Sequence, residues 1–202
     1  MNSKCIELKN ISYSYENKKI FHSLFLKFKA GVTTAIMAPS GTGKTTLLHI
    51  ICGLISPDTG EILYPVSNPR FSMVFQENRL VESISVYSNI KLVNKTLSKD
   101  DIADILKSME LKNVCHKKTK NLSGGEKRRV AIARALSAEY DILLLDEPFT
   151  GLDDDTKFGI MQYIKDKTKG KTVILVTHNK EDAVFFNCTD IIAYEKLQGN
   201  FS

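Results

Sequence analysis

Residue types that bind phosphate gather in one short run near the start of the chain. The run Ala38-Pro39-Ser40-Gly41-Thr42-Gly43-Lys44-Thr45 nearly fits the phosphate-binding pattern GxxxxGK[ST], with Ala38 in place of its first glycine. Residues 33–37 before it, which combine β-branched and apolar side chains, predict a buried strand, and a helical pattern begins at about Lys44. The first N–H groups of a helix lack partners inside the helix and lie at its positive end, so they suit a polyphosphate. The sequence therefore predicts a nucleotide-binding site.

The side chains of this loop have distinct expected roles. Gly41 and Gly43 let the backbone wrap around an anion. Lys44 reaches the β- and γ-phosphates, and the Thr45 hydroxyl can ligate Mg²⁺. The alternative is a Gly/Thr-rich turn between a strand and a core helix, and Ala38 fits the loop only with a negative φ. The flanking strand and helix favour nucleotide binding, because they are the context that confirms the motif.

Two adjacent carboxylates follow a second apolar run. Ile142-Leu143-Leu144-Leu145 is typical of a central parallel strand, and it ends in Asp146 and Glu147. Asp146 can hold the Mg²⁺ of the bound nucleotide, and Glu147 can polarise an attacking water. Either residue alone could simply cap the next loop, but that explanation is poor for both. We therefore expect a hydrolytic site at the carboxyl end of this strand.

Polar side chains also stand at the ends of two other predicted strands. Gln76 comes directly after the strand expected at 71–75, where an amide can face a ligand. His178 follows the strand expected at 172–176, and a histidine next to the two carboxylates can contact a γ-phosphate. The alternatives are a glutamine bonded to its own loop and a surface histidine without function.

A second turn can also bind an anion. Ser123 and Glu126 form a capping box, so Gly124 and Gly125 lie in the first turn of a helix. Two glycines are costly there unless another molecule approaches the backbone, and the helix N-terminus offers unpaired N–H groups. An ordinary capped helix does not explain the paired glycines, so we expect a second phosphate-binding turn.

The elements that must position these residues indicate an α/β fold. We expect one domain over 1–202, with an antiparallel β region at 1–30 and a core of mostly parallel sheet at 31–76 and 122–202. Helical spacing over 77–121, with a capping box at Ser98 and Asp101, predicts an inserted helical subdomain. Tyr15 ends the second run of the β region, where its ring either stacks on a base or is an ordinary tyrosine.

Composition excludes several classes of protein. Of 202 residues, 43% are hydrophobic and 25% charged, which argues against disordered and fibrous proteins. Since no apolar run approaches the ~20 residues of a membrane helix and no signal core is present, we expect a cytoplasmic protein. Four scattered cysteines argue against zinc and disulfides, and a net charge of +5 in short clusters argues against nucleic acid as a partner.

These motifs, in this order, resemble the nucleotide-binding subunit of ATP-binding cassette (ABC) transporters. The resemblance covers nearly the whole chain, and LSGG followed by an apolar strand and Asp-Glu is close to diagnostic of that family. It rests on the loop at 38–45, Gln76, Leu122-Ser123-Gly124-Gly125-Glu126, Asp146-Glu147, Asp153 and His178.

The resemblance implies a role for each matching residue, with ATP and Mg²⁺ as the cofactors. Residues implied to bind ATP are Tyr15, Pro39, Ser40, Gly41, Thr42, Gly43, Lys44, Thr45, Thr46, Ser123, Gly124, Gly125 and Asp153. Implied catalytic residues are Lys44, Gln76, His178 and the general base Glu147. Implied Mg²⁺ ligands are Thr45, Gln76 and Asp146.

The resemblance also implies partners. Two subunits would pair head to tail, as a homodimer or heterodimer, with Ser123 and Gly125 of one completing the ATP site of the other. The helical insertion near residues 76–90 would contact an integral membrane permease, which places the subunit on the inner face of the cell membrane. Residues 74–80 and the compact segment before them resemble the cassettes of nitrate, sulfonate and thiamine-type importers.

The sequence departs from the family pattern at a few positions. Ala38 replaces a glycine, Glu126 and Lys127 replace residues that are often glutamine, and the short C-terminus argues against a sensor domain. None of these changes removes a group that the chemistry needs. Two other functions stay open: an ABC ATPase in cell division, repair or regulation, and a P-loop kinase, which would leave the Gly124-Gly125 turn without a purpose.

Overall fold

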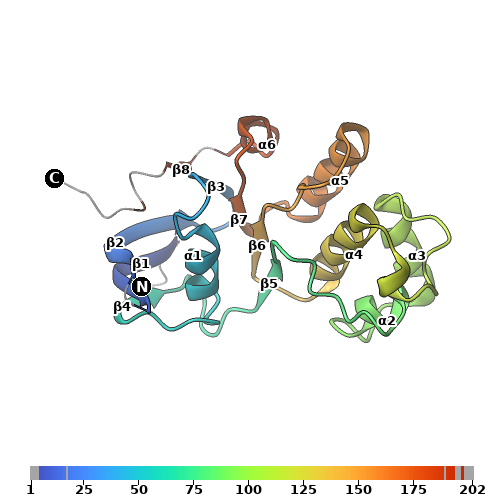
Figure 1. Ribbon diagram of the computed structural model, residues 1–202, viewed down its shortest axis with the longest axis horizontal. Coiled ribbons are helices and arrows are strands. Elements are labelled where there is room, and N and C mark those ends of the chain that lie inside the picture. The colour runs from blue at the N-terminus through green and yellow to red at the C-terminus, as the bar shows by residue number, and fades with distance from the viewer. Residues whose placement is uncertain (1–4, 17, 189, 194–196, 198–202) are drawn as a thin grey trace.

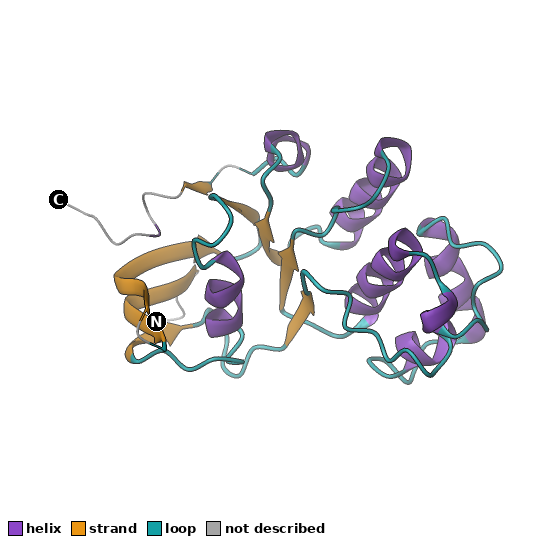
Figure 2. Ribbon diagram, viewed as in Figure 1, coloured by secondary structure: helices purple, strands orange, loops and turns teal. Residues whose placement is uncertain are grey.

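Two β-sheets make up one half of the molecule, and helices make up most of the other half (Figure 2). The computed structural model describes residues 5–16, 18–188, 190–193 and 197. The first sheet is antiparallel, with strand order β2-β1-β4. Its strands are β1 (Cys5–Tyr15), β2 (Lys18–Lys29) and β4 (Thr59–Leu63).

The expected division of the chain differs from the structure at β4. The sequence places this strand in the core segment 31–76, whereas the structure pairs it with β1 in the antiparallel sheet, Leu8 opposite Ile62. The reason is that β1 has a free edge once β2 has paired with its other side, and β4 satisfies the backbone groups of that edge.

The second sheet is parallel, with strand order β5-β6-β7-β3-β8. Because its strands are parallel, their carboxyl ends all lie along one edge. Both central strands, β6 and β7, are buried at every residue, as their unbroken apolar runs predict. The five strands are β3 (Thr33–Met37), β5 (Phe71–Val74), β6 (Ile142–Asp146), β7 (Thr172–Val176) and β8 (Ile191–Ala193).

The parallel sheet lies between the antiparallel sheet with α1 (Lys44–Ile51) and a group of helices at the far end (Figure 1). Alternate residues of a strand point to opposite faces, so the sheet contributes to two cores. Ile142 and Leu144 pack with α1 and the antiparallel sheet. Leu143 and Leu145 pack with the helices.

The helical segment begins after β5. Its elements are α2 (Val86–Lys91), α3 (Lys99–Ser108), the 3-10 turn η1 (Thr119–Asn121) and α4 (Gly124–Ser137). Both predicted capping boxes are present, at Ser98 and at Ser123. The side chain of the buried Asn89 bonds the backbone of Val81 and Ser85, which fixes the loop before α2.

Two further helices follow the central strands. They are α5 (Asp154–Lys167), after β6, and α6 (Lys180–Phe185), after β7. The predicted α/β class with a β subdomain and a helical subdomain is confirmed. The last strand is expected to reach residue 194, which lies outside the described residues. Among the helices that the structure describes, none has both the length and the apolar character to cross a membrane.

Candidate functional site

The loop between β3 and α1 takes a backbone shape that only its glycines make easy. Gly41 has φ of 77° and Gly43 has φ of 91°, a left-handed region where other residues are strained. A Cβ at Gly43 would also lie 2.6 Å from the Ile20 side chain. Ala38 does not have a positive φ, so alanine is compatible with the first loop position.

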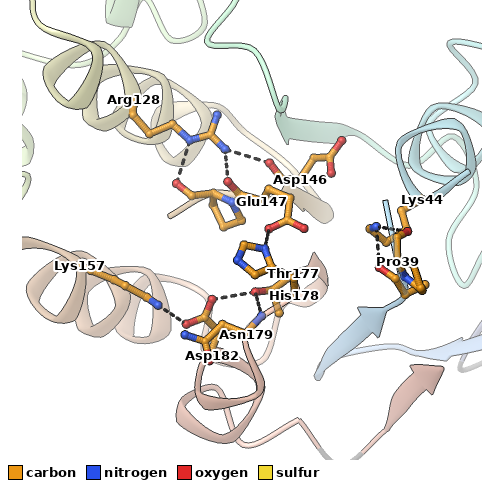
Figure 3. Close-up of polar contacts among 12 residues, drawn as sticks. Pro39, Lys44, Arg128, Asp146, Glu147, Lys157, Thr177, His178, Asn179 and Asp182 are labelled. Carbon is orange, nitrogen blue, oxygen red and sulfur yellow. Dashed lines mark hydrogen bonds and ion pairs between the residues drawn. The ribbon is translucent and has the colours of Figure 1, made fainter. Parts of the chain in front are cut away.

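The Lys44 ammonium group lies against the loop itself. It donates to the carbonyl oxygens of Ala38 at 2.7 Å and Pro39 at 2.9 Å (Figure 3). The Thr45 hydroxyl donates to Oδ2 of Asp146 at 2.6 Å, across 101 positions of sequence. The first turn of α1 is therefore joined directly to the end of β6.

Asp146 is a carboxylate in an apolar position. It is 1% exposed, and burial raises its pKa because the charged form loses hydration. The hydrogen bond from Thr45 and the nearby His49, Lys44 and Arg128 act in the opposite direction. The charged form of this side chain therefore has a cost in free energy that its neighbours offset only in part.

Glu147 occupies a strained turn directly after β6. Its φ is 47°, and its N–H donates to the Val176 carbonyl at 3.0 Å. Its carboxylate lies 2.8 Å from Nδ1 of His178, whose side chain is 75% exposed (Figure 3). The glutamate and the histidine predicted from separate strands therefore meet at the common carboxyl edge of the sheet.

A cavity of about 340 Å³ brings most of the predicted residues together. Thr42 and Pro39 line an adjoining depression of about 450 Å³, together with Lys18 and Lys19. Tyr15 is 63% exposed and pairs with Lys18 across the β1–β2 ladder, next to that depression. The cavity itself is lined by Ile20, Ser40, Gly41, Gly43, Lys44, Thr45, Thr46, Gln76, Asp146 and Glu147.

The second predicted phosphate-binding turn lies outside both lining sets. The Ser123 hydroxyl accepts from the Glu126 N–H at 3.2 Å, which completes the capping box of α4. Gly124 faces open space, and a Cβ at Gly125 would lie 3.6 Å from the Gly151 carbonyl. Asp153 caps α5, since its Oδ1 accepts from the Thr156 N–H at 3.0 Å. The two turns predicted to bind anions thus lie at separate places on the chain.

Two groups of residues around the site were not predicted from the sequence. The first is Arg128, which lies on the buried face of α4 one turn before Ile132 and bonds to the ends of β5 and β6. An arginine at helical spacing from apolar residues is the signal that could have identified it. The second is Asp182, which joins Lys157 and Thr177 behind His178 (Figure 3).

A comparison with family models matches residues 21–150 to the family described as ABC transporter. The chain belongs to the ABC transporter family. The matched segment contains the loop at 38–45 (the nucleotide loop), Gln76, the turn at 122–126 (the signature turn) and the Asp146-Glu147 pair.

Two curated ABC relatives are import proteins by name. The chain is 35% identical over 195 residues to the sulfate/thiosulfate import ATP-binding protein CysA of Mesostigma viride, covering 89% of this chain and 56% of the relative. It is 32% identical over 200 residues to the spermidine/putrescine import ATP-binding protein PotA of Mycoplasma capricolum, covering 91% and 57%. The chain therefore spans about half the length of these ABC relatives.

Solved structures give the same ABC family. The dimeric structure of MJ0796, a bacterial ABC transporter cassette, matches with a TM-score of 0.82 and 32% identity, covering 93% of each chain. A second structure of that cassette, a dimeric post-hydrolysis state bound to ADP and Pi, matches equally well. The fold predicted from the sequence is thus the fold of an ABC cassette.

Proposed function

We propose that this chain is the ATP-hydrolysing subunit of an ABC transporter and that it works as a head-to-tail pair. The arrangement of its two anion-binding turns is the observation that carries this proposal. The nucleotide loop shares one cavity with Gln76, Asp146 and Glu147, while the turn at Ser123 lies outside that cavity. A second subunit can supply the missing turn, and the cassette MJ0796 is itself a dimer.

ATP and Mg²⁺ are the proposed cofactors. Lys44 and the first N–H groups of α1 would bind the phosphates. The donor set fits a hard cation, because the Thr45 hydroxyl, the Asp146 carboxylate and the Gln76 amide all offer oxygen ligands. Burial raises the pKa of Asp146, and a cation would compensate the charge of its carboxylate, which supports this fit. The cation would supply charge neutralisation at the phosphates.

Hydrolysis requires a positioned water and a base. In our proposal Glu147 orients the water and accepts its proton as the new bond to the γ-phosphorus forms and the bond to the bridging oxygen breaks, which gives ADP and phosphate. The contact of 2.8 Å between Glu147 and His178 supports a joint role, with His178 contacting the γ-phosphate. Tyr15 would stack on the adenine beside the Lys18 depression.

The membrane partner is proposed to bind the helical subdomain near residues 76–90. Val81 is 43% exposed on a loop whose backbone is held by Asn89 and Thr119. The two relatives named for import favour an importer on the inner face of the membrane. Their solutes differ from the nitrate, sulfonate and thiamine classes that residues 74–80 indicate, and the solute class stays a prediction.

A mixture of two inactive variants tests the proposed pair. Lys44→Ala removes the phosphate contacts of one subunit, and Ser123→Arg blocks the signature turn of the other. Each variant alone should lose most of its ATPase activity, while a mixed dimer keeps one intact site with Lys44 and Ser123 from different chains. We expect each mixed dimer in the mixture to hydrolyse ATP at up to about half of the wild-type rate. A mixture as inactive as its components would contradict the shared site.

A further inference from the structure

Arg128 makes an unusual number of contacts for a buried side chain. It is 3% exposed, and its guanidinium donates to five carbonyl oxygens (Figure 3 shows those of Asp146 and Glu147). All five acceptors belong to the backbone rather than to carboxylates. They are Phe75 at 2.5 Å, Gln76 at 3.3 Å, Asp146 at 2.9 Å, Glu147 at 2.6 Å and Pro148 at 2.8 Å.

The five contacts of Arg128 depend on the planar shape of its guanidinium group. Nε and both Nη atoms each donate to a different part of the acceptor set, which a lysine or glutamine of similar length cannot reproduce. Burial lowers the pKa of Arg128, and the charges of Asp146 and Glu147 act in the opposite direction. The group stays a cation, and the carbonyl dipoles around it replace the water it has lost.

The five acceptors belong to two segments that carry the hydrolytic residues. Phe75 and Gln76 leave β5, and residues 146–148 form the turn after β6 in which Glu147 has its positive φ. A strained residue keeps its conformation only where its surroundings fix it. Arg128 itself belongs to α4, whose first turn is the signature turn. The Arg128 side chain therefore links the signature turn, which would face the partner subunit, to Gln76 and Glu147, which would act in the subunit's own nucleotide site.

We propose that Arg128 is a positioning residue that holds the backbone of Gln76 and Glu147 against α4. The hydrolytic residues of a subunit then move together with the signature turn that the same subunit presents to its partner. This inference rests on the proposed ATPase function. It assigns to Arg128 an effect on the rate of hydrolysis in its own nucleotide site rather than on nucleotide binding.

The neighbouring Arg129 is a matched control. It has the same chemistry on the same helix, but its guanidinium donates to the carbonyls of Met109 at 3.4 Å and Glu110 at 3.3 Å in the helical segment. The variants are Arg128→Gln, Arg128→Lys and Arg129→Gln. Arg128→Lys keeps the positive charge but loses the planar set of guanidinium donors. It therefore separates the role of the charge from that of the donor geometry.

The mixed dimer described above provides the test. Its intact site combines the nucleotide loop of the Ser123→Arg chain with the signature turn of the Lys44→Ala chain. Arg128→Gln or Arg128→Lys in the Ser123→Arg chain should lower kcat by roughly tenfold or more, with KM for ATP changed less than about threefold. The same substitution placed in the Lys44→Ala chain should cause a loss in kcat that is at least about fivefold smaller. Equal losses in the two chains, or losses equal to those of Arg129→Gln, would overturn the proposal.

Amide hydrogen exchange of the separate chain gives a second measurement that needs no activity. Arg128→Gln should speed exchange in segments 75–77 and 146–149, and Arg129→Gln should leave both segments as in the wild type. Unchanged exchange in Arg128→Gln would contradict the positioning role. If the mixed dimer that keeps Arg128 in both chains shows no ATPase activity, the proposed function is refuted. The exchange result would still decide the role of Arg128 in that case.

Discussion

The burial of Asp146 supports the proposed cation from a single residue. A carboxylate that is 1% exposed is costly to ionise, and the Thr45 hydroxyl at 2.6 Å compensates only part of that cost. Residues of this kind reduce the stability of the free protein, which is the usual trade-off at a functional site. The sequence predicted the residue from its place at a strand end, but the energetic cost depends on the packing around it.

Asp146→Asn should therefore stabilise the protein in the absence of ATP and Mg²⁺. Because the pKa of Asp146 is raised in the fold, the native state holds its proton more tightly than the unfolded state, and wild-type stability falls as pH rises through the native pKa. At pH 7 we expect a gain of about 0.5–2 kcal/mol in the free energy of unfolding, or a few degrees in Tm. Urea unfolding at several pH values measures this gain in stability. The gain should vanish as the pH is lowered toward 3.8, the ordinary pKa of an aspartate.

Asp141→Asn is the control with the opposite sign. The Arg70 backbone N–H and guanidinium lower the pKa of Asp141, so its stabilising effect is present at neutral pH and is lost as pH falls through the native pKa. The neutral variant should be slightly less stable at pH 7. A loss of stability in Asp146→Asn at pH 7 would contradict the account of Asp146 as a charge that needs a cation.

At the scale of residues, short sequence patterns were sufficient to predict site residues that lie near one another in the chain or at strand ends. The spacing within 38–45 and the Asp146-Glu147 pair are of this kind. The contacts of Arg128 were not predictable, because its acceptors lie 18 to 53 positions away and depend on how α4 packs against β5 and β6. Likewise, the pairing of Glu147 with His178 follows from the neighbouring positions of β6 and β7.

At the scale of elements, α5 and α6 hold the turn that carries His178. Lys157 of α5 lies 2.6 Å from Asp182 of α6, with side chains 17% and 4% exposed. The other carboxylate oxygen of Asp182 accepts from the Thr177 hydroxyl at 2.8 Å, which in turn accepts from the Asn179 N–H. This chain of contacts fixes the backbone on both sides of His178, so helix packing sets the position of a catalytic candidate.

Lys157→Met should destabilise the protein by about 3 kcal/mol, because it leaves the Asp182 charge buried without its partner. Urea unfolding measures the loss. Lys169→Met is the matched control, since its pair with Asp166 is on the surface with side chains 79% and 51% exposed. That control should cost less than about 1 kcal/mol. Similar losses in the two variants would contradict a special role for the α5–α6 pair.

The order of elements was more predictable than their pairing. Apolar runs, capping boxes and glycine-bearing turns located most helices and strands within a few residues. The expected core segment 31–76 contains β4, which the structure pairs with β1, because the sequence of β4 is the same whether it pairs with β1 or extends the core. Strand pairing is decided by contacts across about fifty positions of chain, and local patterns do not contain that information.

At the scale of the whole molecule, the two ends of the fold serve different partners in our proposal. The nucleotide cavity lies where α1 meets the parallel sheet, and the helical subdomain lies at the far end (Figure 1). Arg128 belongs to α4 of the helical segment and donates to the backbone at the ends of β5 and β6. A signal from a permease at the helical end can therefore reach Gln76 and Glu147 through packed backbone rather than through a mobile loop.

Val81→Glu should separate membrane assembly from hydrolysis. Its exposed side chain lies on the loop fixed by Asn89 and Thr119, so a charge there leaves the fold intact and opposes burial against an apolar partner. Leu54→Glu is the control, because Leu54 is 58% exposed shortly after α1, a helix that lies away from α2 and α3 (Figure 1). Both variants should keep ATPase activity within about twofold of wild type. In detergent extracts of the native membrane, Val81→Glu should recover at least about tenfold less of a multi-spanning membrane protein than Leu54→Glu. Equal recovery with the two variants would mean that the permease contacts another surface.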